Sequence, residues 1–226
     1  MFTSIVNLFF PKTCAGCNAL LLQTETVLCT QCRHDIPLTN HFNIKENEAF
    51  AKFYGKIPAG FVIALMEFHK KGIVQEMIHK LKYKGQQDIG KTIGYWCAEN
   101  LKMLPEIQTI DCIVPVPLHP KKLKKRGYNQ VTTFGKTLSE VLKIPYDENI
   151  LIRTQYTETQ TKKTRLNRTE NVKDIFDINY KYSTPNKNFL LIDDVITTGS
   201  TLVSCAQALQ KIPNSTVSIV CMAMSM

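Results

Sequence analysis

The sequence lacks an apolar run long enough to cross a bilayer, which takes about 20 residues. Its apolar first stretch, residues 1–10, has no basic residue before the apolar run and no small-residue cleavage site, and Pro11 ends it. A secretory signal peptide has both features, so their absence argues against one. We therefore expect a cytoplasmic protein with no membrane span.

Acidic residues are few, because 19 Asp and Glu stand against 28 Lys and Arg, which gives a formal net charge of +9. An excess of cations attracts polyanions such as nucleic acids, although it says nothing about the fold. The 226 residues, 44% of them hydrophobic, suffice for one good core and a small appendage.

The stretch at residues 189–201 combines three features in a fixed order. An apolar run of strand length comes first, two carboxylates (Asp193 and Asp194) follow it, and a hydroxyl-rich loop comes last. Beyond the loop, apolar residues at helical spacing predict a helix. They are Leu202, Cys205, Ala206, Leu209 and Ile212.

A strand, a hydroxyl-rich turn and a helix start together make an anion site, because free backbone N–H groups and the helix dipole attract a phosphate. Gly199 allows the backbone to approach the ligand closely. The acids would repel a phosphate unless they bound sugar hydroxyls or Mg²⁺. Phosphate, ribose diol and Mg²⁺ describe a phosphoribosyl ligand; the alternative is an ordinary turn at a sheet edge.

Residues 191–201 resemble the loop that binds 5-phosphoribosyl-1-pyrophosphate (PRPP) in type I phosphoribosyltransferases. The resemblance implies PRPP and Mg²⁺ as ligands of Asp193, Asp194, Val195, Ile196, Thr197, Thr198, Gly199, Ser200 and Thr201. In such enzymes the loop after the first core strand holds the pyrophosphate, which here implies Pro117, Leu118 and His119, with Arg126 nearby. Asp193, Asp194 and Arg126 are the candidate catalytic residues.

Four cysteines form two C-x-x-C pairs, Cys14 with Cys17 and Cys29 with Cys32. Four thiolates at this spacing suit a structural, tetrahedral zinc ion. Two disulfides are one alternative, which a cytoplasmic chain disfavours. An iron centre is a second, less favoured alternative. The remaining cysteines are isolated among apolar residues, which predicts small core residues. They are Cys97, Cys112, Cys205 and Cys221.

Residues 34–60 show no clear periodicity and connect the cysteine pairs to the rest of the chain. His34 and His41 stay unassigned, because four cysteines already fill a structural metal site. We divide the chain into a zinc-binding module with its connection at residues 1–50 and a phosphoribosyltransferase-like domain at residues 51–226.

Strands and helices alternate along this second part, which predicts a mostly parallel α/β sheet flanked by helices. Ligands then bind at the carboxyl ends of the strands. Besides the strand that begins at residue 189, strands are expected at residues 61–68, 111–117, 149–152 and 217–222, and helices at residues 73–81, 89–101 and 129–142.

Five cations occupy six positions after the strand at residues 111–117, and no acid lies among them. They are Lys121, Lys122, Lys124, Lys125 and Arg126. Such a run is commonly a solvated face, but at a strand end it would also attract a pyrophosphate or a nucleic-acid backbone.

Residues 114–119 and 125–130 resemble the competence protein F (ComF) family. The resemblance extends over nearly the whole chain, taking in the cysteine pairs, residues 81–85, residues 160–168 with Asn171, and the PRPP loop. It implies a role in natural transformation, with the DNA-uptake machinery as partner. The polar residues 154–169 are either a lid over the reacting centre or a mobile surface loop.

Two functions stay open. The first is a PRPP-binding protein of DNA uptake that also binds single-stranded DNA, which the net charge and the interleaved Tyr83, Tyr128 and Tyr156 favour. The second is an active transferase with an orotate-like or amine acceptor. Purine-salvage transferases carry an aspartate where this chain has Thr197, so salvage of hypoxanthine or guanine is disfavoured.

Overall fold

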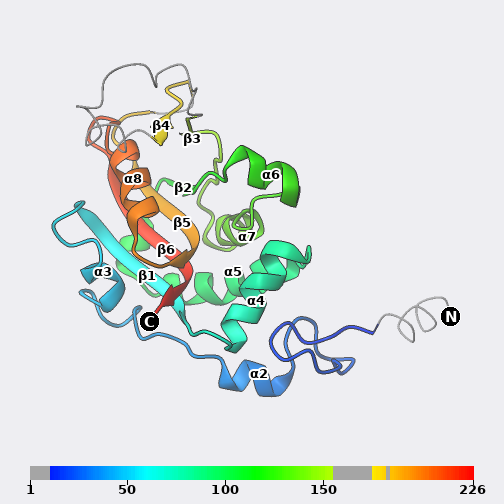
Figure 1. Cartoon of the computed structure of the whole chain (residues 1–226). Helices are drawn as coiled ribbons and strands as arrows, with labels where there is room; N and C mark the ends of the chain where they lie inside the picture. Colours follow the sequence, from blue (N-terminus) through cyan, green and yellow to red (C-terminus); the bar gives the residue numbers. More distant parts are fainter. Residues whose placement is uncertain (1–10, 155–174, 182–183) are drawn as a thin grey trace, which may run out of the picture.

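The computed structural model describes residues 11–154, 175–181 and 184–226 (Figure 1). At its centre is a four-stranded sheet in the order β1-β6-β5-β2, in which every neighbouring pair is parallel. The strands are β1 (Ala59–Phe68), β2 (Cys112–Pro115), β5 (Asn188–Ile196) and β6 (Thr216–Ser225). The predicted parallel α/β sheet is confirmed.

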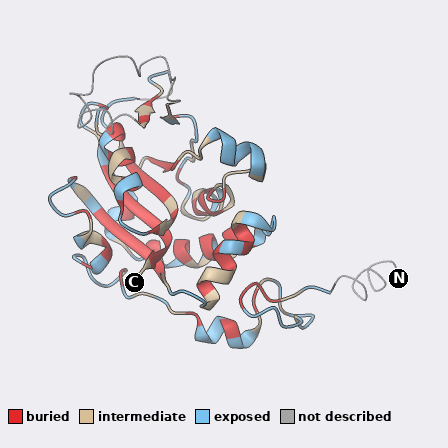
Figure 2. Ribbon diagram, viewed as in Figure 1, coloured by how far each residue is buried: buried red, intermediate tan, exposed pale blue. Residues whose placement is uncertain are grey.

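Helices cover both faces of the sheet, with α4, α5 and α7 on one face and α3 and α8 on the other (Figure 1). One cluster of buried hydrophobic residues lies on each face. Figure 2 shows that buried residues run along the strands of the sheet and into the helices around it. The helices are α2 (Thr30–Asp35), α3 (Glu48–Ala51), α4 (Ile73–Tyr83), α5 (Asp88–Leu101), α6 (Pro120–Arg126), α7 (Thr132–Leu142) and α8 (Ser200–Leu209), with a 3-10 helix, η1, at Pro105–Thr109.

Strand β5 is buried on both faces, which is why it is a continuous apolar run in the sequence. Leu190 and Ile192 belong to the core on the α4–α5–α7 face, whereas Phe189 and Leu191 belong to the core under α8. Successive side chains of a strand point to opposite faces. The alternation directs Asp193 toward the α8 face and the next acid of the strand toward the α4 face.

Helix α7 packs unusually close to β5 because Gly135 has no side chain. A Cβ at this position would lie 2.5 Å from the Tyr146 ring and 2.6 Å from Cδ1 of Ile192. This close packing brings the start of α7, and Gln130 just before it, over the carboxyl end of the sheet.

The strand expected at residues 149–152 does not join the parallel sheet. Strand β3 (Leu151–Arg153) instead pairs antiparallel with β4 (Phe176–Ile178) in a separate two-stranded sheet. Strand β4 was not predicted, because three residues are too few to show a period. Residues 155–169, for which a lid or a surface loop is expected, lie outside the described residues, and so does Tyr156.

Helix α7 begins at Thr132, three residues later than expected. The side chain of Asn129 donates to the Val116 carbonyl at 3.0 Å and accepts from the Val131 N–H, which holds the preceding residues in a turn. The basic segment forms a helix of its own, α6, which starts at Pro120, a residue well suited to the first turn of a helix. The division at residue 50 stays a prediction.

Candidate functional site

The loop after β5 opens helix α8 at the carboxyl end of the sheet. Gly199 precedes the helix with a left-handed φ of 79°, and a Cβ there would lie 3.2 Å from the Phe53 ring. Thr197, Thr198 and Ser200 are exposed, and the hydroxyls of Thr198 and Ser200 are 3.0 Å apart. The loop therefore presents hydroxyls and the N-terminus of a helix to an incoming anion.

Lys52 adds a cation to this loop. Its Nζ donates to the Thr197 carbonyl at 3.1 Å. Lys52 follows α3 within the connecting segment, 145 positions before Thr197, so the sequence pattern gave no signal for it. A lysine beside exposed N–H groups and hydroxyls increases the attraction of the loop for a phosphate.

Asp194 is a buried carboxylate with two strong partners. One of its oxygens, Oδ2, accepts from Lys82 Nζ at 2.8 Å and from Gln130 Nε2 at 2.7 Å. The side chain of Asp194 is only 8% exposed and that of Lys82 is 23% exposed. Lys82 comes from the end of α4 and Gln130 from the start of α7, so this acid joins three elements over the end of β5.

Asp193 has a different environment on the other face of β5. Its Oδ1 accepts from the backbone N–H of Asp194 at 2.8 Å. Burial, together with the negative charge of Asp194, raises the pKa of Asp193 to about 8, although the backbone hydrogen bond and Lys82 act in the opposite direction. The two adjacent acids therefore differ: the surroundings of Asp193 favour its protonated form, whereas Asp194 is paired with a lysine.

The segment after β2 lies next to the end of β5, because the Val116 N–H donates to the Ile192 carbonyl at 3.0 Å. Pro117, Leu118 and His119 continue from this point and are partly exposed. The His119 ring caps α6, with Nδ1 accepting from the Lys121 N–H at 3.1 Å. The structure thus brings this segment to the same sheet edge as the loop after β5.

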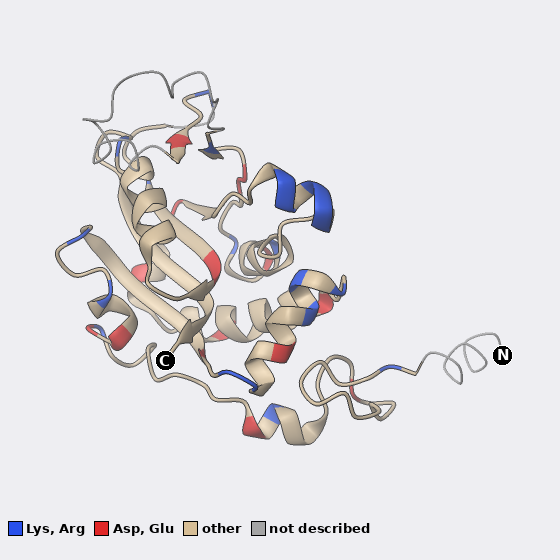
Figure 3. Cartoon of the chain, viewed as in Figure 1, with Lys and Arg blue, Asp and Glu red and all other residues tan. Residues whose placement is uncertain are grey.

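Helix α6 has no buried residue, and its four lysines are exposed. Figure 3 shows that Lys and Arg occupy most of this helix. Arg126 is partly buried, donates to Oε1 of Gln130, and lies with its guanidinium 5.3 Å from the centre of the Tyr83 ring. Because Gln130 also donates to Asp194, a chain of hydrogen bonds connects the basic helix to the acid of β5.

The sequence did not indicate Lys82 or Gln130 as partners of Asp194. Both residues fall in segments that resemble the ComF family, and the helical period of α4 adds that Lys82 follows the buried Leu81 at the margin of the buried stripe. That period shows that Lys82 flanks the core, but it cannot show which acid the lysine meets.

The four cysteines of the two C-x-x-C pairs form a separate cluster whose sulfur atoms all lie within 4.8 Å of one another. Cys17 Sγ and Cys29 Sγ are 3.8 Å apart. Thiolates at about 2.3 Å from a tetrahedral zinc ion are about 3.8 Å apart, so this spacing fits. The residues Cys14, Cys17, Cys29 and Cys32 could hold a metal ion.

Backbone N–H groups stabilise the thiolate form of a cysteine in this cluster, which is the form that binds a cation. Gly16 and Cys29 each donate a backbone N–H to Cys14 Sγ at 3.3 Å. Burial by itself raises the pKa of Cys14, but these backbone hydrogen bonds outweigh it and lower the pKa to about 6. Burial and the neighbouring thiols raise the pKa of Cys32. Crowded thiols of this kind lose their protons together only when a cation balances them.

The cysteine cluster packs directly against α4. Gly16 lies so close that a Cβ on it would be 2.8 Å from Cγ2 of Ile73. Lys80 is buried and donates to the Cys14 carbonyl at 2.8 Å. The Arg33 guanidinium, from α2, lies 5.8 Å from the centre of the Trp96 ring on α5. The same helix that carries Lys82 thus supports the cysteine cluster.

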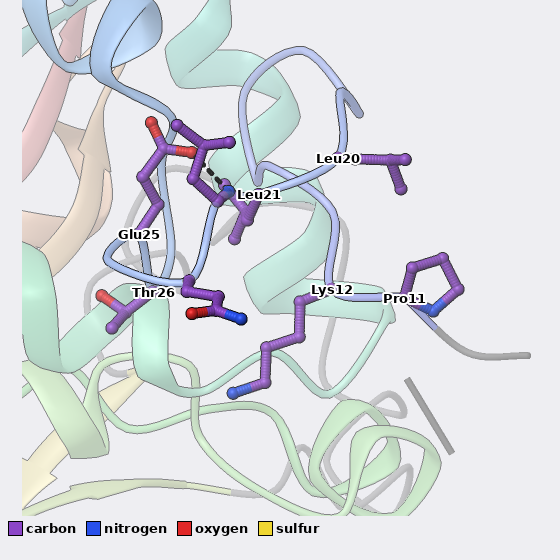
Figure 4. A pocket seen from close by; sticks show the side chains of 8 residues that line it. Pro11, Lys12, Leu20, Leu21, Glu25 and Thr26 are labelled. Carbon is purple, nitrogen blue, oxygen red and sulfur yellow. Dashed lines mark hydrogen bonds between the residues drawn. The ribbon is translucent and has the colours of Figure 1, made fainter. Parts of the chain in front are cut away.

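A surface hollow of about 470 Å³ lies at the turn between the two cysteine pairs (Figure 4). Glu25 shapes this turn, with Oε2 accepting from the Leu22 N–H at 2.8 Å (Figure 4) and Oε1 accepting from the Thr30 N–H at 2.6 Å. These hydrogen bonds lower the pKa of Glu25. The hollow belongs to the cysteine module and does not include the residues at the sheet edge.

The four cysteines outside the cluster and His41 lie in the interior of the protein. Cys97, Cys112, Cys205 and Cys221 are buried free thiols, which confirms their prediction as core residues. His41 is buried, with Nδ1 accepting from the Ala64 N–H at 3.2 Å and Nε2 lying 3.2 Å from Glu48. Within the described residues, no helix combines the length and the hydrophobicity that a bilayer crossing requires.

Replacing Lys82 with Met should lower the free energy of unfolding by about 2–4 kcal/mol, because it leaves Asp194 buried without its cation. Removing both charges, in Lys82→Met with Asp194→Asn, should recover much of that loss. Urea unfolding at pH 7 measures both, with Lys84→Met as the exposed control. A double variant less stable than the single one would contradict this account of the pair.

The chain was compared with known proteins. No family model matches the sequence. It is 29% identical to Competence protein F of Haemophilus influenzae over 214 residues, covering 90% of this chain and 93% of that protein. It is 26% identical to the DNA utilization protein YhgH of Escherichia coli K12 over 212 residues, covering 92% and 88%.

Solved structures with a similar arrangement include the glutamine PRPP amidotransferase from B. subtilis, with a TM-score of 0.45, 17% identity and 64% of this chain covered. The match spans only 30% of the amidotransferase chain. An adenine phosphoribosyltransferase gives a TM-score of 0.39 at 14% identity, covering 66% of this chain and 75% of that one. The full-length curated relatives confirm the resemblance to the competence protein F family that the sequence motifs indicate.

Proposed function

We propose that this chain is a PRPP-binding, phosphoribosyltransferase-like protein of the ComF type that acts in DNA uptake. The observation that carries the proposal is the hydroxyl-rich helix start at Thr197 to Ser200, which lies beside two acids and several cations at one sheet edge. The names of its relatives, Competence protein F and DNA utilization protein, support the role in DNA uptake.

Each part of PRPP has a matching group at this edge. The loop at residues 197–201 would hold the 5′-phosphate, with Lys52 beside it. Asp193 and Asp194 would accept the ribose hydroxyls and contribute to the Mg²⁺ shell. The pyrophosphate would lie against the segment at residues 117–119, near Arg126 and Lys82. Mg²⁺, when bound with PRPP, neutralises the phosphate charge and orients the leaving pyrophosphate.

An active phosphoribosyltransferase is the second candidate function. Lys82 contacts Asp194, and Arg126 is joined to the same acid through Gln130, so two cations could stabilise the charge of a leaving pyrophosphate, which favours this candidate. Pyrophosphate release from Mg-PRPP, measured with orotate, amines or no acceptor, separates an enzyme from a PRPP-binding protein.

We further propose that the ion held by the four cysteines is zinc. Four thiolates in a tetrahedral arrangement fit zinc, and the 3.8 Å spacing of Cys17 and Cys29 agrees with its bond length. Iron in a rubredoxin-like site is the alternative. A cytoplasmic location is part of this proposal, because that compartment keeps thiols reduced and available to a metal.

The purified protein should carry about one zinc per chain. Cys29→Ser should remove most of it and loosen the cysteine module, because metal binding is coupled to folding in so small a unit. Cys112→Ser, a buried cysteine outside the cluster, should keep the zinc. Elemental analysis and limited proteolysis measure both effects. Iron in place of zinc, or full zinc in the Cys29 variant, would contradict the proposal.

Mg-PRPP should bind at least tenfold more weakly after Asp193→Asn with Asp194→Asn, because each lost charge-assisted hydrogen bond costs about 1.5–3 kcal/mol. Asp88→Asn, at the exposed start of α5, is the matched control. Gly199→Val should also weaken binding, because the Phe53 ring leaves no room for the added side chain. Calorimetric titration gives the affinities, and melting curves show that the variants fold. Equal affinity in the double variant would rule out the assigned site.

The raised pKa of Asp193 gives the same binding event a pH signature. Below about pH 8 this acid is protonated, and it must release its proton to offer a charged carboxylate to Mg²⁺ and to the ribose hydroxyls. Affinity for Mg-PRPP should therefore rise with pH between pH 7 and 8 and level off above it. Asp193→Asn should flatten the profile, whereas a flat profile in the parent protein would exclude the coupling. The range avoids the phosphate ionisation near pH 6.

Single-stranded DNA binding should weaken steeply with salt if α6 contacts the backbone. About five neutralised phosphates give a log–log slope of about −3.5, and replacing the four lysines of α6 by Ala should flatten it by about 2.8. A charge-matched control replaces exposed lysines elsewhere: Lys45, Lys56, Lys102 and Lys136. Anisotropy titrations between 50 and 200 mM salt measure the slopes. Equal slopes in the two variants would remove the basis for this contact.

A further inference from the structure

Tyr83, the last residue of α4, is an exposed aromatic ring held between two partners. It is 62% exposed, and the Arg126 guanidinium lies 5.3 Å from its ring centre. One turn earlier on the same helix, the exposed His79 ring lies with its centre 5.0 Å from that of Tyr83. The ring therefore has two defined neighbours, while most of its surface remains open to solvent.

The surroundings of this ring come from two distant parts of the chain. Tyr128 donates its hydroxyl to the Leu81 carbonyl, which fastens the turn after α6 to the end of α4. Gly127 makes that turn possible with a left-handed φ of 81°. The fold thus sets the basic helix directly beside Tyr83, an arrangement that the spacing of 43 residues between Tyr83 and Arg126 does not reveal.

A stabilising contact between α4 and α6 would by itself account for a cation beside a ring, and at an exposed site such a contact contributes about 0.5–1 kcal/mol. Such a contact does not explain why further cations lie near the ring with no acid to balance them. The four lysines of α6 are all exposed, and residues 118–130 contain no acid. Such an unbalanced concentration of cations beside an open aromatic ring is typical of proteins that bind single strands.

We propose that Tyr83, supported by Arg126 and His79, is a base-stacking platform of the single-strand-binding surface, on which the lysines of α6 hold the neighbouring phosphates. The proposal rests on the DNA-binding part of the proposed function and names the residue that contacts a base. The occupant is a single strand, because the bases of a duplex are already stacked on one another and cannot reach a ring.

The hydrogen-bond chain places this platform next to the proposed phosphoribosyl site. Arg126 donates to Gln130, and Gln130 donates to Asp194, so the residue that supports the platform is also joined to the acid of β5. A strand stacked on Tyr83 would therefore lie along the same sheet edge as PRPP.

The test uses two fluorescent probes of about 15 nucleotides, oligo(dT) and an abasic phosphodiester of the same length. Tyr83→Ala should weaken oligo(dT) binding about five- to 150-fold and leave the abasic probe nearly unchanged, because the variant loses stacking and keeps every cation. Tyr83→Trp should restore binding. Tyr95→Ala, with a 55% exposed ring on α5, should bind both probes like the parent.

Four outcomes are distinguishable. Selective loss of oligo(dT) binding with rescue by tryptophan supports the platform. Unchanged oligo(dT) binding in Tyr83→Ala overturns the platform and leaves the DNA-binding role intact. An equal loss for both probes also overturns it, because the ring would then act through the charges or the fold. A parent protein that binds neither probe overturns the DNA-binding role and the platform together.

Discussion

The carboxylate of Asp194 imposes the constraint on which the site depends, because a buried charge must be paired to be tolerated. Lys82 and Gln130 meet that requirement, and in doing so they fix the end of α4 and the start of α7 over the end of β5. The positions of Tyr83 and Arg126 follow, since each belongs to or bonds with one of these partners. The need to pair the buried Asp194 carboxylate thus determines where Lys82 and Arg126 lie at this sheet edge.

Helix α4 contacts both Asp194, through Lys82, and the cysteine cluster, through Lys80. Lys80 and Lys82 are two residues apart, so they extend to different sides of the helix, one to the Cys14 carbonyl and the other to Asp194. Gly16 packs tightly against Ile73 at the opposite end of α4. A metal ion bound by the four cysteines would therefore also steady the helix that pairs with Asp194. This gives the module a part in the site although none of its cysteines lies at the sheet edge.

The sequence predicted most of what is local in this protein. The strand, acids, loop and helix around Asp194 follow one another in the chain, and the two cysteine pairs have a characteristic spacing. Both features can therefore be recognised from the sequence. The partners of these features are not local: Lys52 and Thr197 are 145 positions apart, and Gln130 and Asp194 are 64 apart. No periodicity encodes such pairs. The antiparallel β3–β4 pair was missed for a related reason, because its strands have only three residues each.

The two adjacent acids resolve an electrostatic conflict at the end of β5. Two ionised carboxylates beside a phosphate loop would repel each other and the ligand. Strand alternation directs them to opposite faces, where Asp194 is neutralised by Lys82, while burial raises the pKa of Asp193 and so favours its protonated form. If PRPP binds here as proposed, the ligand-free site would present little negative charge to the arriving polyphosphate. A metal ion arriving with that ligand would favour ionisation of Asp193, so the acid would gain its charge when a cation is there to meet it.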